Sequence, residues 1–428
     1  MSPSVELDRT LPPSPTSAGE ARRLLREVLS ETGAGDWVDN AQVAISELVT
    51  NALVHAGTPI RLHVHAERGG LRVEVADGNP HLPRQRDYAA TSPTGRGLHL
   101  VDELVDSWGA FPDSDGKVVW FEIREGERST RRAPLLPIPV DAEPPVLVSV
   151  QVDLLEVPLL MHLAWQEHAA ALLREYLLAT MEDDATVIEQ HAGASEALSI
   201  LHEQVPEPEL ALEPGRVMDD AAGTGLVAPR CAVRIPADSL GSFATLDALL
   251  DAAVEMAESG SLLSPPVQPE MRELRRWICR EVREQGRGAA PRPWWPVTAD
   301  EPPPDGLEEL VWDPAPVTGS TRALVAVDDA NRVVAISAGA LDLLGYDVAG
   351  DLVGRRLLHI VPERYHQAHV AGFTLHLTNG RSPLIGNRVT VPVRCRSGEE
   401  RLVGMVVTVE GLPRGRRVFT AELLDEAG

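Results

Sequence analysis

The chain has 428 residues, of which 43% are hydrophobic, and it carries a net charge of −25 at neutral pH. This length exceeds what one hydrophobic core usually covers, so we expect two or three domains. The sequence has no apolar run of about 18 residues and no basic–apolar signal pattern at its start, so we expect a cytoplasmic protein without a membrane segment. Three scattered cysteines support neither a disulfide framework nor a zinc site.

The first strong pattern predicts a helix over residues 41–56 with one apolar face. Glu47, Asn51 and His55 follow at steps of four residues, so they fall along one side of that helix. A carboxylate and a carboxamide one turn apart suit a hydrated Mg²⁺, which takes only one or two protein oxygens. The carboxylate could equally orient or deprotonate an attacking hydroxyl. Taken alone, the same pattern also fits a solvated polar face.

Two runs of alternating hydrophobicity, residues 61–66 and 71–76, predict a hairpin around a glycine pair. The second run ends in the turn Asp77-Gly78-Asn79-Pro80. A carboxylate at a strand end can accept a hydrogen bond from an adenine amino group, and the adjacent glycine lets the backbone approach the base. This turn is therefore a candidate adenine site.

A glycine-rich segment, Gly95-Arg96-Gly97, precedes an apolar-periodic run that begins at Leu98. Such a helix start presents free backbone N–H groups and the positive end of the helix dipole to phosphates. A lone Gly-x-Gly has a high false-positive rate. Here it follows the polar helix and the adenine-type turn in order, which makes the set of three more specific than its parts.

Together these segments resemble the GHKL ATPase fold (the Bergerat α/β sandwich) of gyrase, histidine kinases and MutL, over residues 15–127. Within that fold they are most similar to anti-sigma-factor serine/threonine kinases of actinobacteria. The resemblance implies ATP and Mg²⁺ as cofactors, with Glu47 as the catalytic base and Asn51 as the Mg²⁺ ligand. It also implies a cofactor-binding set made of the adenine turn and the glycine segment: Asp77, Gly78, Asn79, Gly95, Arg96, Gly97 and Leu98.

Two departures from the family pattern bear on catalysis. The adenine box commonly reads Asp-x-Gly-x-Gly, whereas this chain has Asn79-Pro80, and Val118 stands where relatives often carry a hydroxyl residue. Nucleotide binding survives such changes more readily than phosphoryl transfer does. Three functions therefore stay open: a kinase acting on an anti-sigma antagonist, a non-catalytic ATP-responsive regulator that binds a sigma factor or another protein, and a partner of a separate serine phosphatase.

Beyond a proline-rich linker at residues 128–145, residues 146–287 predict a mainly helical domain. The helices are expected at 158–181, 186–204, 243–258 and 271–285, and they suggest a coupling or homodimerisation element. Residues 141–319 hold 11 basic and 32 acidic residues, a net charge of −21. That charge would repel phosphate backbones, so we expect no direct nucleic-acid binding. His162 and His168 are six residues apart, off a common helix face, which argues against a metal pair.

A second linker, residues 288–319, is rich in proline and tryptophan and leads to a strand–helix–strand pattern over residues 320–412. Gly345-Tyr346, Leu352-Val-Gly354 and Ile360-Val-Pro-Glu363 resemble the landmarks of a PAS sensor domain. We expect residues 1–14 to be disordered and residues 413–428 to form a C-terminal tail. The whole is expected to be an α+β protein.

His369 lies where the haem-ligating histidine falls in rhizobial oxygen-sensor PAS domains. A haem would require that imidazole to face an apolar cavity. The same stretch also occurs in PAS domains of this type without haem, where the histidine can simply hydrogen-bond within the fold. The sequence thus leaves the PAS ligand unknown, with haem as one possibility.

Overall fold

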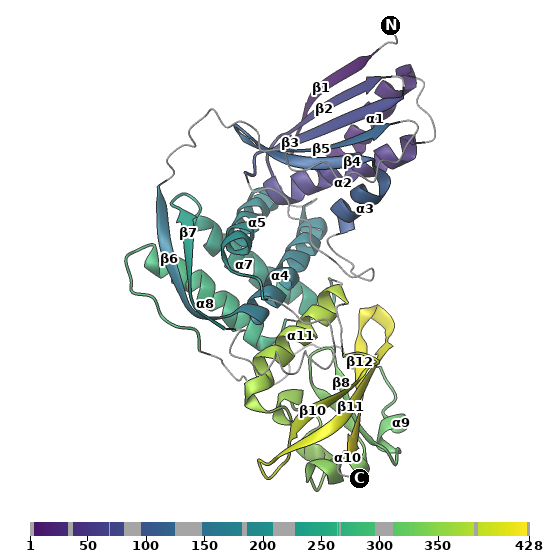
Figure 1. Cartoon of the computed structure of the whole chain (residues 1–428), viewed down its shortest axis with the longest axis vertical. Helices are drawn as coiled ribbons and strands as arrows, with labels where there is room; N and C mark the ends of the chain where they lie inside the picture. Colours follow the sequence, from purple (N-terminus) through teal and green to yellow (C-terminus); the bar gives the residue numbers. More distant parts are fainter. Residues whose placement is uncertain are drawn as a thin grey trace. The chain divides into compact units, whose positions relative to one another are not determined.

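The computed structural model describes residues 4–32, 37–67, 69–80, 96–124, 148–181, 186–208, 227–262, 264, 267–295, 311–380 and 384–425 (Figure 1). The chain divides into two compact units. The first contains residues 1–150, 176–201 and 235–249, and the second contains residues 151–175, 202–234 and 250–428. Both mix helices with antiparallel sheets, so the expected α+β class is confirmed. Among the helices described, none has an apolar stretch long enough to cross a bilayer.

The first unit contains a five-stranded antiparallel sheet in the order β1-β2-β3-β5-β4. Its strands are β1 (Val5–Leu11), β2 (Ile60–Glu67), β3 (Gly70–Asp77), β4 (Ser107–Asp113) and β5 (Gly116–Arg124). The prediction of a disordered segment before residue 15 was wrong, because β1 pairs with β2 along its whole length, from Val5 opposite Ala66 to Leu11 opposite Ile60.

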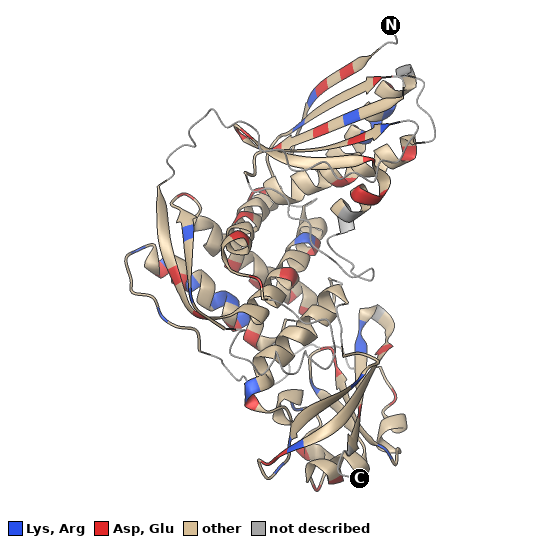
Figure 2. Ribbon diagram, in the orientation of Figure 1, with Lys and Arg blue, Asp and Glu red and all other residues tan. Residues whose placement is uncertain are grey.

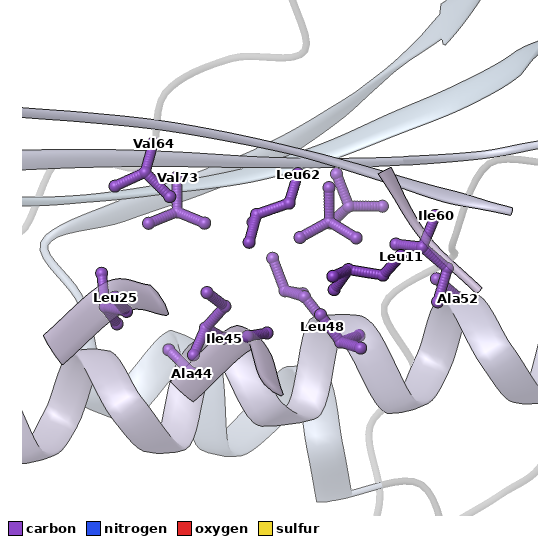
Figure 3. Close-up of a cluster of buried hydrophobic side chains, with 14 of the residues drawn as sticks. Leu11, Leu25, Ala44, Ile45, Leu48, Ala52, Ile60, Leu62, Val64 and Val73 are labelled. Carbon is purple, nitrogen blue, oxygen red and sulfur yellow. The ribbon is translucent and has the colours of Figure 1, made fainter. Parts of the chain in front are cut away.

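Helices α1 (Ser17–Thr32) and α2 (Val38–Ala56) pack on one face of this sheet, and α3 (Arg96–Leu104) packs beside α2. Figure 3 shows strand side chains such as Leu62 and Val64 meeting Ile45 and Leu48 of α2. These side chains are almost fully buried, and burying each aliphatic side chain contributes about 1.5–3 kcal/mol. On β2, the residues that alternate with the buried ones face outward, as the period of two in the sequence predicted.

Two further helices belong to the first unit, at least in part. α5 (Thr186–Gln204) lies against the C-terminal end of α2, where Ser195 Oγ is 3.4 Å from the carbonyl oxygen of Val54. α7 (Leu240–Glu258) is tied to α5 through the carboxylate of Glu196, which accepts hydrogen bonds from Ser239 and Ser242 at 2.8 and 3.0 Å. Helices from the region expected to form a middle domain thus pack with α2 and with each other in the first unit.

The second unit includes most of α4 (Leu159–Thr180), α8 (Pro269–Gln285) and the two-stranded sheet of β6 (Ser149–Pro158) and β7 (Val227–Pro236). Figure 2 shows basic residues along α8, which carries five arginines among its 17 residues. Trp294, expected in a linker, is buried: its backbone N–H donates to Leu155 at 2.9 Å, and its ring lies 5.7 Å from that of Trp277. The start of that linker is therefore packed structure.

The C-terminal region forms an antiparallel sheet in the order β10-β11-β12-β8-β9. Its strands are β8 (Ala323–Asp328), β9 (Val333–Ile336), β10 (Arg388–Arg394), β11 (Glu400–Gly411) and β12 (Arg417–Asp425). Helices are α9 (Ala315–Thr318), α10 (Ala338–Leu344) and α11 (His366–Asn379), with short 3₁₀ turns at Ala349–Asp351, Leu357–His359, Glu363–Tyr365 and Pro413–Gly415. The expected C-terminal tail was wrong, since β12 pairs with both β11 and β8 at the centre of the sheet.

A buried polar contact joins this C-terminal region to α8 in the second unit. The Arg356 guanidinium forms an ion pair with Glu270 and donates to Gln268 Oε1 at 2.9 Å. Both side chains of the ion pair are buried, with exposures of 3% for Arg356 and 9% for Glu270. A second buried contact links Asn379, at the end of α11, to Glu167 on α4.

Candidate functional site

Helix α2 carries the first part of the site. One face packs under the sheet through residues such as Ile45, Leu48 and Ala52, which fixes the rotation of the helix. Glu47 and Asn51 then lie one turn apart and half-buried. Within the described ranges, neither side chain makes a hydrogen bond, so no described donor competes with a ligand for their oxygen atoms. A carboxylate and an amide oxygen so placed fit the few protein contacts that Mg²⁺ takes when phosphate oxygens and water complete its shell.

The turn after β3 is fastened to the end of the same helix. Asn79 Nδ2 donates to the carbonyl oxygen of His55 at 2.7 Å, and the Asn79 backbone N–H donates to Asp77 Oδ1 at 2.9 Å. The Gly78 N–H donates to Thr58 Oγ1 at 2.8 Å. Because His55 lies one turn beyond Asn51, the adenine-type turn and the polar face of α2 are held in one frame. Asn79, which departs from the family pattern, is the residue that makes this connection.

Glycine is required where the β4–β5 hairpin meets this turn. Gly116 has φ +154°, and a Cβ there would lie 2.0 Å from the carbonyl oxygen of Asp77 and 2.7 Å from the Cα of Gly78. A Cβ on Gly78 would itself meet the Thr58 side chain at 2.8 Å. Any larger residue at position 116 must push the backbone apart. The absence of side chains lets the start of β5 close over the turn.

This close approach brings Lys117 onto Asp77. The Lys117 ammonium donates to Asp77 Oδ1 at 2.8 Å and to the carbonyl oxygen of Asn79 at 3.2 Å. The pair is buried, with side-chain exposures of 7% for Lys117 and 2% for Asp77. Burial raises the pKa of the Asp77 carboxyl, against the opposing effect of Lys117, and burial lowers the pKa of the Lys117 ammonium.

Lys117 was not predicted as a site residue. It is the one lysine among the 39 basic residues of the chain. The decisive relation is the strand register, which sets Lys117 directly opposite Asp77. Val118, the other departure noted from the sequence, is buried in the same strand.

The phosphate-facing segment is only partly within the described residues. Gly95 lies outside them, whereas Arg96 and Gly97 begin α3, in agreement with the expected helix. Val101 of this helix is fully buried in the core, and Leu98 packs against that core. A contact of 3.4 Å from Asn40 Nδ2 to the carbonyl oxygen of Leu104 fixes α3 on α2. The phosphate role of Gly95, Arg96, Gly97 and Leu98 stays a prediction.

His369, the candidate haem ligand, has a partner inside the fold. Its Nε2 lies 3.1 Å from Asn331 Oδ1, and its ring stacks on Phe373 with centroids 6.1 Å apart. Burial, with Arg356 and His366 nearby, lowers the pKa of His369 to about 4. A haem could use this nitrogen only by displacing Asn331, so a hydrogen-bonding role fits the geometry better. Across the described part of the chain, no group of three or more His, Cys, Asp or Glu residues is placed to hold a metal ion.

A search against curated proteins found no match. Among solved structures, the chain resembles the PAS domain of an HTR-like protein from Haloarcula marismortui (18% identity, covering 26% of this chain and 86% of that one, TM-score 0.21). It also resembles an RNA-binding light-oxygen-voltage receptor (14% identity, covering 98% and 95%, TM-score 0.22). Scores this low leave the C-terminal fold to be judged from its sheet.

The N-terminal region has a family match. Residues 11–123 match the model of the histidine kinase-like ATPase domain. That range begins at the end of β1 and ends in β5, so it contains the described parts of the candidate site: the polar face of α2, the Asp77 turn and the start of α3. The first sheet and helices α1 to α3 thus lie in a segment that is similar to the histidine kinase-like ATPase domain.

Proposed function

We propose that the chain is an ATP-binding signalling regulator of the cytoplasm whose N-terminal domain binds ATP together with Mg²⁺. The observation that carries the proposal is the joining of α2 and the Asp77 turn through Asn79, inside the segment that matches an ATPase model. An acceptor for the base, the metal-binding amide of Asn51 and the carboxylate of Glu47 would then be parts of one frame. The C-terminal sheet domain would act as a PAS-like sensor that modulates the output.

Each site residue has a separate task in this proposal. Asp77 accepts a hydrogen bond from the adenine amino group, and the amide oxygen of Asn51 ligates the metal. Bound Mg²⁺ neutralises phosphate charge, which is most of what phosphoryl transfer requires besides positioning. Glu47 would orient, or take the proton from, a serine or threonine hydroxyl of a protein substrate. The finer proposal is therefore a serine/threonine kinase of the anti-sigma type, acting on an antagonist protein.

A second candidate function is a non-catalytic regulator that binds its partner in response to ATP. The buried Lys117–Asp77 pair favours it, because an ammonium already occupies one oxygen of the base acceptor. Val118 favours it too, since it replaces a hydroxyl with an apolar side chain close to that pair. The partner under this reading is a sigma factor, its antagonist or a separately encoded serine phosphatase.

Calorimetry on the full chain, with and without Mg²⁺, tests ATP binding. The wild type should bind ATP in a Mg²⁺-dependent manner, Asn51→Ala should lose that dependence, and Gln42→Ala on the same helix is the matched control. Failure of the wild type to bind ATP would end both candidate functions.

Labelled ATP and candidate antagonist domains separate the two functions. Transfer that disappears in Glu47→Gln, while ATP binding persists, supports the kinase. Regulation in cells that survives Glu47→Gln but not Asn51→Ala supports the non-catalytic regulator.

A further inference from the structure

The Lys117–Asp77 pair has unused hydrogen-bonding capacity at the place where a base would lie. An ammonium group carries three N–H donors, and an ionised carboxylate offers about four lone-pair positions on two oxygens. Among the described residues, Lys117 has two acceptors, Asp77 Oδ1 and the Asn79 carbonyl oxygen. Within those residues, one N–H of Lys117 is therefore without an acceptor, beside a carboxylate that can accept further donors.

Stability alone does not account for this pair. Removing two charges from water costs several kcal/mol per ion, so a buried ion pair is often no better than two apolar side chains of similar volume. Here both side chains are more than nine-tenths buried on neighbouring strands, where an apolar cross-strand pair would pack well. The fold also depends on glycine at position 116 to bring the two strands this close.

We propose that Lys117 is a second base-reading residue, which extends and rests on the proposed ATP-binding function. Asp77 accepts from the 6-amino group of adenine, and the Lys117 ammonium donates its remaining N–H to the ring nitrogen N1. On adenine, the donor (the 6-amino group) lies next to the acceptor (N1). In the protein, the matching acceptor (Asp77 Oδ1) and donor (the Lys117 ammonium) also lie next to each other, 2.8 Å apart. Lys117 thus determines specificity, because a 6-oxopurine such as guanine offers the opposite order, an acceptor at O6 and a donor at N1.

The magnitude of the discrimination follows from the kind of bond. A hydrogen bond from a charged donor in a buried site is stronger than one from a neutral donor. An ammonium N–H that faces a C–H group has no acceptor, which costs free energy in a buried site. Replacing N1 by a C–H group, as in 1-deaza-ATP, keeps the 6-amino group and the phosphates. We expect the full-length wild type to bind ATP at least about tenfold more tightly than 1-deaza-ATP.

Two variants extend the calorimetric test. Lys117→Met should reduce the ratio of ATP to 1-deaza-ATP affinity to about twofold or less, because its side chain cannot donate. Lys117→Arg retains a charged donor and should restore part of the ratio. A ratio near one in the wild type would overturn the proposal, as would a Lys117→Met variant that retains the full wild-type ratio.

A spectroscopic test avoids variants that fail to fold. Since Lys117 is the chain's one lysine, incorporation of lysine labelled at its ε-carbon gives a single side-chain resonance in the whole protein. ATP should shift this resonance substantially, and 1-deaza-ATP should shift it much less. If ATP binds but both nucleotides give equal affinity and equal shifts, the Lys117 inference fails while ATP binding stands. If ATP does not bind the wild type, both the proposed function and the Lys117 inference fail.

Discussion

Removing Glu270 should loosen the contact between α8 and the C-terminal sheet domain. Glu270→Leu leaves the Arg356 guanidinium, whose side chain is 3% exposed, with Gln268 as its remaining side-chain partner among the described residues. Breaking a buried ion pair by removing one partner costs about 3–5 kcal/mol, and the remaining Gln268 contact favours the lower end of that range. The double variant Glu270→Leu with Arg356→Met should recover most of the loss, because no charge is then buried without a partner.

Hydrogen exchange on the full chain, followed peptide by peptide, measures this effect locally. A chain with several domains does not unfold in one step, so a single melting temperature would mix unrelated events. A loss of about 3 kcal/mol corresponds to roughly 100-fold faster exchange in peptides from α8 and from residues 352–360, provided that their opening requires the contact to break. The matched control is Glu273→Leu on the same helix, whose pair with Arg276 is exposed and should contribute less than about 1 kcal/mol. Equal exchange in Glu270→Leu and Glu273→Leu would refute the reasoning.

Three further outcomes follow from the described geometry. Gly116→Ala places a Cβ 2.0 Å from a backbone oxygen, so hydrogen exchange in β3 and β5 should show a local loss of about 3 kcal/mol or more, and titration should show weaker ATP binding. Gly372→Ala, whose Cβ meets nothing within 4 Å in a helix, should leave exchange in α11 unchanged or slightly slower. Asn79→Ala removes the hydrogen bond from the turn to the end of α2, so ATP affinity should fall while hydrogen exchange in β1 and β2 changes little; an unchanged affinity would show that the turn needs no such anchor. Burial lowers the pKa of His162 to about 3 and that of His369 to about 4. As the pH falls, the two histidines therefore take up protons in the unfolded chain before they do so in the folded chain. The free energy of unfolding should fall by about 1.4 kcal/mol per pH unit per histidine as the pH drops from about 6.5 towards the folded-state pKa values. Hydrogen exchange in peptides from α4 and α11 at pH 7 and pH 5, corrected for the intrinsic exchange rate, measures that slope, and His162→Gln should reduce it in α4; an unchanged slope would contradict the assignment.

Local periodicity was enough to predict much of the secondary structure. The polar helix, observed as α2, and the β2–β3 hairpin both repeat their apolar residues at the spacing of the element they form. The strands that were missed, β1 and β12, are defined by distant partners. β12 pairs with β8, about 90 residues earlier in the chain. No local pattern around residues 417–425 therefore predicts its position in the sheet.

The candidate site likewise contains residues that the local sequence predicts and one residue that depends on strand pairing. Glu47, Asn51 and Asp77 stand out because each residue type has a chemical use at a defined point of a predicted element. Lys117 could not be identified by that route, since its partner lies 40 residues away and depends on which strands pair. Only the register of β3 with β5 turns two charges of opposite sign into neighbours.

The end of α2 has two neighbours in the first unit. On one side the Asn79 amide holds its last turn, and next to it Gly57 follows in a left-handed conformation with φ +59°. A Cβ at Gly57 would collide, at 2.9 Å, with both Ala192 and the carbonyl oxygen of Ile188 on α5. Because the backbone of Gly57 approaches α5 this closely, a movement of the Asp77 turn that shifts the end of α2 would also press on α5. If the proposed function holds, variants at position 57 can test whether nucleotide binding and output are coupled through this contact.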